Sequence, residues 1–146
     1  MLIRLGTATA SWLGHLLGKI GQWLGAPPPD SYGHITEYRS NPIVARMRLS
    51  GIVFGNVVLY SVGDPAIRVP RYDRCGYVEL REHEWAHVAQ YRGWGALFWL
   101  KYGLAECARP FTASRINRYE MLADDSCRRS WPAVNGQKIA RNDVIS

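Results

Sequence analysis

The sequence has few cysteines, and no two of them form a C-x-x-C pair. The three are Cys75, Cys107 and Cys127, an odd number that argues against a small domain built on a disulfide framework. A bridge between Cys107 and Cys127 could form in an oxidising compartment. We favour the simpler interpretation that all three are reduced and partly buried thiols.

The sequence also lacks long runs of one kind of residue. No stretch of about 18 apolar residues occurs, so a membrane-spanning helix is not expected. Basic residues outnumber acidic ones by 18 to 12, and the net charge of +6 favours contact with anionic surfaces such as nucleic acid or lipid headgroups. No basic run exceeds two residues, and no recognition-helix or RNA-binding signature occurs, so nucleic-acid binding is not expected.

The composition predicts one folded domain. The chain has 146 residues, of which 47% are hydrophobic and 21% charged, enough to bury a single core. We divide the chain into an amphipathic helix at 1–25, a linker at 26–41, a domain at 42–135 and a loosely held tail at 136–146.

Residues 1–25 are predicted to form an amphipathic helix that the prolines of "GAPPPD" terminate. His15 and Lys19 interrupt its apolar character and no A-x-A site follows, so a cleavable signal peptide is not expected. The helix either docks against the domain core, which we favour, or lies in a membrane interface through residues 1–24, with tryptophans at headgroup depth. The protein is accordingly expected in the cytoplasm or at a membrane surface.

Two stretches of the next segment have strand character. "IVARMRL" (43–49) alternates apolar and basic residues, and "GIVFGNVVLY" (51–60) is rich in β-branched and aromatic residues. We predict a strand in each, joined tightly at Ser50–Gly51 in a possible hairpin. Residues 66–70 are predicted to form a short edge strand that ends at Pro70.

Three helices are predicted after these strands. The first runs from about residues 77–79 to Arg92 with Gly93 as its cap, the second covers 94–108, and the third covers 117–129. The predicted class is therefore α+β, with a small antiparallel sheet packed against helices.

The first of these helices contains the motif His83-Glu84-Trp85-Ala86-His87. Residues four apart on an α-helix lie on one face, about 6 Å apart along the axis, so His83 and His87 can each offer an imidazole nitrogen to one ion. Glu84 lies close enough to His87 around the helix to hold a metal-bound water without being a ligand. This is the H-E-x-x-H arrangement of zinc hydrolases.

A catalytic zinc needs a third protein ligand, and no histidine follows His87. The third ligand must then be a carboxylate or a cysteine further on, and "NRYEMLADD" (117–125) offers Glu120 with Asp124 one helical turn later. We favour Glu120 as the zinc ligand and Asp124 as acceptor for the second ring N–H of a histidine. Alternatively, Asn117 and Glu120 form a capping box and Asp124 belongs to an ordinary solvated face.

The two motifs together resemble the gluzincins, the thermolysin-like group of zinc metallopeptidases. More narrowly, residues 77–128 are similar to small bacterial zincin-like proteins that carry HExxHVxQY, an aromatic and glycine-containing segment, and then N-x-[FY]-E-x-x-A. Residues 1–76 resemble no family that we can name. The resemblance implies a minimal zincin-like domain, with the small antiparallel sheet against the HExxH helix and a second ligand-bearing helix. It implies His83, His87 and Glu120 as zinc ligands and Glu84 as general base. Less directly, it implies Asp124 as the hydrogen-bond acceptor that orients a ligand histidine.

The expected reaction is hydrolysis of a peptide bond. Zinc lowers the pKa of a bound water towards about 7, and Glu84 takes its proton and passes it to the leaving amine. Arg115 and Tyr119 are the main candidates for stabilising the oxyanion, with Tyr91 and His34 as further ones. A peptide or protein substrate is expected to extend an edge strand within 51–60 or 66–70.

Two alternatives to an independent enzyme stay open. Zinc could link two helices in a non-catalytic structural or interaction module, which could also be membrane-peripheral. A domain of this size could also depend on a helper protein that completes a shallow active site.

Overall fold

The computed structural model describes residues 2–70, 77–95, 97–108 and 117–125. Its centre is a four-stranded sheet in the order β1–β2–β4–β3, whose strands are β1 (Asp30–Tyr32), β2 (Ile35–Tyr38), β3 (Gly51–Phe54) and β4 (Val57–Tyr60). Strands β2 and β4 are parallel and the other pairs antiparallel, so the sheet is mixed and not antiparallel as predicted. A separate antiparallel pair, β5 (Arg68–Pro70) and β6 (Tyr77–Glu79), confirms the short strand expected at 66–70.

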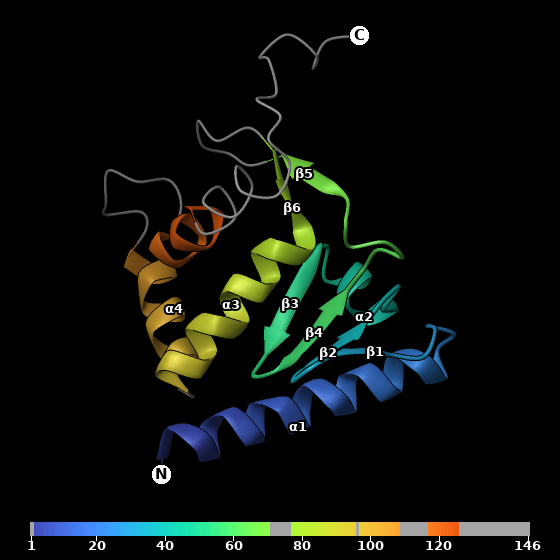
Figure 1. Cartoon of the computed structure of the whole chain (residues 1–146), viewed down its shortest axis with the longest axis horizontal. Coiled ribbons are helices and arrows are strands. Elements are labelled where there is room, and N and C mark those ends of the chain that lie inside the picture. The colour runs from blue at the N-terminus through green and yellow to red at the C-terminus, as the bar shows by residue number, and fades with distance from the viewer. Residues whose placement is uncertain (1, 71–76, 96, 109–116, 126–146) are drawn as a thin grey trace, which may run out of the picture.

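Helices cover both faces of the sheet (Figure 1). Helix α1 (Leu2–Trp23) and the short α2 (Pro42–Arg46) lie on one side, and α3 (Leu80–Trp94) and α4 (Leu97–Ala108) on the other. A further helical segment at 118–125 lies beside α4. The α+β class is therefore confirmed. Among the described residues, no helix combines the length and the apolar character that a membrane crossing requires.

Strand β4 shows why helices cover both faces of the sheet. All four of its residues are buried, and successive side chains of a strand point to opposite faces. Val58 and Tyr60 join the core beneath α3 and α4, whereas Val57 and Leu59 join the core beneath α1 and α2.

The segment at 43–49 is not the predicted strand, because α2 covers most of it. Asn41 caps this helix: its Oδ1 accepts from the backbone N–H of Ile43 (3.0 Å) and of Val44 (3.4 Å). Pro42 occupies the first turn, where its missing N–H is not needed. These two residues outweigh the alternating pattern that predicted a strand.

The neighbouring predictions also change in detail. The hairpin lies within 51–60, where Gly55 has the positive φ (64°) required between β3 and β4. Part of the 26–41 linker forms β1 and β2. Gly95, not Gly93, terminates α3, with its N–H 2.6 Å from the carbonyl of Tyr91. The end of the last predicted helix and the 136–146 tail lie outside the described residues.

Helix α1 docks on the sheet through a face of small residues. A Cβ built on Gly14 would lie 2.7 Å from Cβ of Val57, and one on Gly18 would lie 2.5 Å from the ring of Tyr38. Ser11 continues this face, and its hydroxyl accepts a hydrogen bond from the backbone of Asn56 (3.0 Å). The helix backbone therefore sits directly on the sheet.

Candidate metal site

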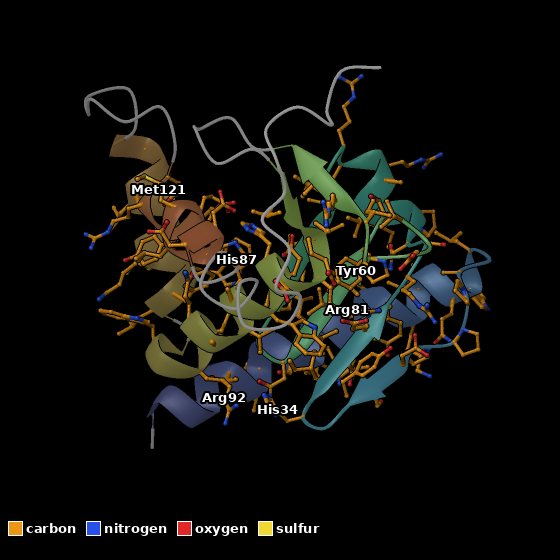
Figure 2. The ribbon with its side chains drawn as sticks, turned by 45° about the horizontal axis from the view of Figure 1, so that its top comes forward. His34, Tyr60, Arg81, His87, Arg92 and Met121 are labelled. Atoms are coloured by element: carbon orange, nitrogen blue, oxygen red, sulfur yellow. The ribbon has the colours of Figure 1, made fainter. Side chains whose placement is uncertain are left out.

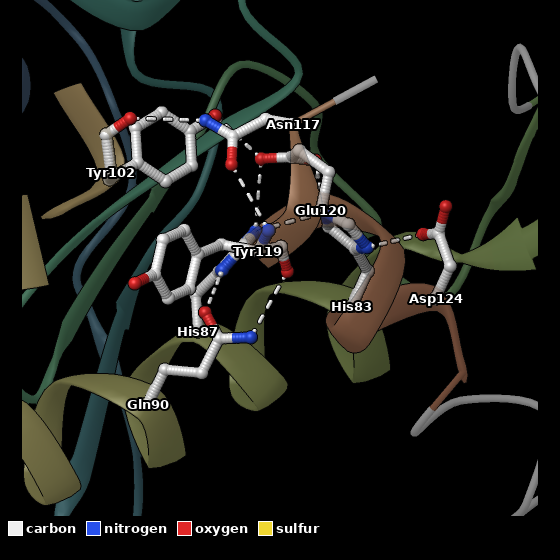
Figure 3. A network of polar contacts seen from close by, with 8 residues as sticks. All are labelled: His83, His87, Gln90, Tyr102, Asn117, Tyr119, Glu120 and Asp124. Atoms are coloured by element: carbon white, nitrogen blue, oxygen red, sulfur yellow. Dashed lines mark hydrogen bonds and ion pairs between the residues drawn. The ribbon is translucent and has the colours of Figure 1, made fainter. Parts of the chain in front are cut away.

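Three side chains from two helices converge on one point (Figure 3). His83 and His87 lie one turn apart on α3, and Glu120 belongs to the 118–125 helix. The Nε2 atoms of the two histidines are 3.2 Å apart. Glu120 places Oε2 3.1 Å from Nε2 of His83 and Oε1 3.2 Å from Nε2 of His87. The structure thus brings together the three residues that the sequence offered as ligands.

The second ring nitrogen of His83 faces Asp124. Nδ1 of His83 lies 2.7 Å from Oδ1 of Asp124, and both side chains are buried. Two lone pairs at this distance would repel each other, so the hydrogen must lie on Nδ1, because a carboxylate oxygen can only accept. Neutral His83 then directs the lone pair of Nε2 towards Glu120 and His87.

The second ring nitrogen of His87 faces Gln90. Nδ1 of His87 lies 3.0 Å from Oε1 of Gln90, and the amide Nε2 of Gln90 donates to the backbone carbonyl of Tyr119 at 3.0 Å. The carbonyl fixes the orientation of the amide, since only its nitrogen can donate. Oε1 must therefore accept from Nδ1 of His87, which leaves the lone pair of this ring also on Nε2.

With both rings neutral, the result is a cluster of electron-pair donors facing one another. Two imidazole lone pairs and a carboxylate meet within about 3 Å. Burial alone would raise the pKa of Glu120, but when these two rings carry a proton on Nε2 their hydrogen bonds and charges lower that pKa well below its ordinary value. The ligand atoms lie within 4.8 Å of one another, and this group could hold a metal ion.

A hydrogen bond to its carboxylate and a cap at the start of its helix position Glu120. The hydroxyl of Tyr102 on α4 donates to its Oε1 at 2.6 Å. Asn117 starts the 118–125 helix by accepting from the backbone N–H of Tyr119 (3.0 Å), and its amide donates to the carbonyl of Tyr102 (3.1 Å). Asn117 is therefore a cap, as in the alternative raised from the sequence, while the carboxylate of Glu120 faces the histidines.

Glu84 lies at the edge of the sheet. Its side chain is buried, and a Cβ built on Gly51 would lie only 2.6 Å from its Oε1. Gly51 begins β3, which is an outer strand of the four-stranded sheet. The carboxylate of Glu84 thus borders the backbone of an edge strand.

A second buried carboxylate, Glu37 on β2, ties α3 to the sheet. Its Oε1 accepts from Nε1 of Trp85 at 2.7 Å and from the hydroxyl of Tyr60 at 3.2 Å, and Nε of Arg81 lies 3.3 Å away. Burial, together with the charges of Glu37 and Glu84, raises the pKa of Tyr60 far above its ordinary value, so the phenol keeps its hydrogen. Tyr60 and Arg81 come close together from the sheet and the helix (Figure 2).

Of the candidates for an oxyanion donor, two are buried, one is exposed and one lies outside the described residues. The side chains of Tyr91 and Tyr119 are buried in the core beneath α3 and α4. His34 is exposed, accepts from Nη1 of Arg92 at 2.8 Å and lies apart from His87 (Figure 2). Arg115 lies outside the described residues. The role of each in the reaction stays a prediction.

The sequence did not identify three residues that hold the site: Gln90, Tyr102 and Glu37. Gln90 could have been found, because it follows His87 by three positions and such pairs meet on a helix. Glu37 lies two positions after the buried Ile35 on a strand, a weaker signal for burial. Tyr102 reaches Glu120 across two helices, and no local pattern predicts this contact.

Among the described residues, no cysteine belongs to the cluster. Cys107 is free and exposed, and Cys75 and Cys127 lie outside the described residues.

Comparison with protein-family models, with curated proteins and with solved structures gives no match to this chain. The resemblance of the two motifs to gluzincins therefore stays a prediction.

Proposed function

We propose that this protein is a zinc-dependent metallopeptidase, with His83, His87 and Glu120 as ligands and Glu84 as general base. The observation that carries the proposal is the mutual approach of the three ligand atoms at 3.1–3.2 Å, with Nδ1 of each histidine directed instead at Asp124 or Gln90. Ligands about 2.0–2.2 Å from an ion in tetrahedral geometry lie about 3.3–3.6 Å apart, a few tenths of an ångström from these distances. Two imidazoles and a carboxylate form a ligand set typical of catalytic zinc.

The chain's own residues would divide the reaction between them. A bound zinc ion would supply Lewis-acid polarisation of the scissile carbonyl and would make water a stronger acid. Glu84 would accept a proton from the attacking water and deliver it to the leaving amine, so that a peptide and water give a carboxylate and an amine. Asp124 and Gln90 would keep the two imidazoles in the tautomer that binds metal.

The substrate would lie along β3. Among the described strands, β3 pairs with β4 alone, and its first residue, Gly51, borders Glu84. A peptide added to this edge would bring its backbone past the general base, and its affinity would come mainly from main-chain hydrogen bonds. The absence of a side chain at Gly51 leaves Glu84 room beside the strand.

One observation favours a second candidate, a structural metal site without catalysis. The cluster joins α3 to the short 118–125 helix, so a bound metal ion would cross-link these two segments. A structural site does not require a carboxylate at Glu84, and this difference separates the two candidates.

The test uses the zinc-loaded protein and a library of internally quenched peptides. Glu84→Gln is expected to keep the metal and to lose hydrolysis by a factor of at least about 100. Glu82→Gln, two residues earlier on the same helix, is the matched control and should cleave like wild type. Cleavage by Glu84→Gln at the wild-type rate, or no cleavage by wild type, would contradict the peptidase proposal and favour the structural one.

A further inference from the structure

The outer face of α1 is apolar, although the helix is already docked. The face that meets the sheet is built from Ser11, Gly14, Gly18 and Gly21. On the opposite side, Trp23 is 91% exposed and Trp12 is 66% exposed. Figure 1 shows the helix along one side of the molecule, with no other described element beyond it.

These exposed side chains form a single stripe. At about 100° per residue, those of residues 12–23 fall within an arc of roughly 100° centred opposite the glycine face. The stripe consists of Trp12, Leu13, Leu16, Ile20 and Trp23. Continuous apolar surface of this kind is unusual on a protein and marks a site of interaction.

The charge of α1 indicates what the stripe contacts. The helix contains no Asp or Glu, and the first acidic residue of the chain is Asp30. Lys19 is exposed and lies about 20° around the helix from Trp12, at the border of the stripe. An apolar stripe with tryptophans, a cationic border and no acidic residue matches an anionic lipid surface.

We infer that α1 binds the surface of an anionic bilayer through the stripe from Trp12 to Trp23. The helix lies parallel to the membrane, its glycine face stays on the sheet, and the two indole rings enter the interface about 16 Å apart at similar depth. The metal cluster is built on the opposite side of the sheet, so membrane binding leaves it free. This inference does not depend on the proposed peptidase activity.

The test measures co-sedimentation of the full chain with vesicles of phosphatidylcholine containing 30% phosphatidylglycerol. Wild type is expected to bind these vesicles more tightly than pure phosphatidylcholine. Trp12→Ser/Trp23→Ser should weaken binding at least about tenfold, and Lys19→Gln about fivefold on the anionic vesicles alone. Leu100→Ser/Leu104→Ser on α4, at positions 60% and 61% exposed, removes exposed apolar side chains elsewhere on the protein and should leave binding unchanged.

Three outcomes would overturn the inference. The first is a wild-type protein that does not bind anionic vesicles. The second is a loss of binding in the α4 variant equal to that in the tryptophan variant, which would show non-specific hydrophobic adsorption. The third is a wild-type dimer in analytical ultracentrifugation that the tryptophan substitutions make monomeric, which would identify a second copy of the chain as the occupant. Unchanged far-UV circular dichroism of the variants would show that they fold.

Discussion

Nδ1 of His83 lies 2.7 Å from the carboxylate of Asp124, and this contact fixes which nitrogen of the ring can bind a metal. Removing the carboxylate frees the ring to rotate and to change tautomer. We expect Asp124→Ala to lower metal affinity about 10- to 100-fold. The measurement is competition with a chromophoric chelator at neutral pH.

The adjacent Asp125 provides the control for this prediction. Its side chain is exposed, whereas that of Asp124 is buried. Asp125→Ala removes the same charge from the same helical turn and should change metal affinity less than about threefold. Equal losses in both variants would mean that general electrostatics, and not the contact with His83, supports the site.

The close approach of Gly51 to Glu84 gives a second prediction. A Cβ at this position would lie 2.6 Å from Oε1 and 2.7 Å from Cδ of Glu84, so Gly51→Ala should displace the carboxylate. On the proposed mechanism, peptide hydrolysis falls at least about tenfold while metal content stays at the wild-type level. Parallel assays of cleavage and of bound metal separate the two effects.

Gly93→Ala is the matched control for Gly51→Ala. A Cβ on Gly93 meets nothing within 4 Å, so the substitution adds a methyl group to open space on α3. We expect unchanged cleavage and a gain in stability of up to about 1 kcal/mol from the higher helix propensity of alanine. Wild-type peptide hydrolysis by Gly51→Ala would contradict the assignment of Glu84 as the general base held beside Gly51.

The buried carboxylate of Glu37 predicts a large effect on stability. Glu37→Ala would leave the indole N–H of Trp85, the hydroxyl of Tyr60 and the charge of Arg81 without this acceptor. We expect a loss of about 2–4 kcal/mol in the free energy of unfolding, measured by urea denaturation. Glu82→Ala removes a half-buried carboxylate from the same helix and should cost less than about 0.5 kcal/mol, and a similar loss in both would contradict the assigned network.

Packing of α1 through its glycines yields a fourth prediction. Gly18→Leu would force a large side chain against the ring of Tyr38, where even a Cβ comes within 2.5 Å. Destabilisation of about 2–3 kcal/mol is expected, measured as a shift of the denaturation midpoint. Leu16→Ala, on the outer side of the same helix, should stay within about 0.5 kcal/mol of wild type. The opposite ranking would mean that the stripe and not the glycine face docks on the sheet.

Much of the candidate site could be predicted because its signals are local. The spacing of His83 and His87 follows from helix geometry, and Asp124 follows Glu120 by one turn of the next helix. The convergence of these two helices required the tertiary structure, since Glu120 lies 33 positions after His87. The orientation of Gln90, and with it the tautomer of His87, depends on the carbonyl of Tyr119, a backbone contact that no side-chain pattern reveals.

The fold was less predictable where competing signals were close in strength. Residues 43–49 alternate like a strand, but the cap at Asn41 and the proline after it favour a helix. For α1, the apolar periodicity of the sequence predicted the helix correctly but not which of its faces packs on the sheet. Apolar periodicity normally marks the buried face, whereas here three glycines permit a closer approach to the sheet and leave the larger apolar side chains outside.

Metal content of the purified full-length chain tests the central claim most directly. After incubation with zinc and removal of unbound metal, inductively coupled plasma mass spectrometry should find about one zinc per chain in wild type and in His34→Ala, which changes an exposed histidine apart from the cluster. His83→Ala and Glu120→Ala should retain less than about a tenth of this amount. A wild type without bound zinc, or metal content unchanged in both cluster variants, would contradict the assignment of His83, His87 and Glu120 as a metal site.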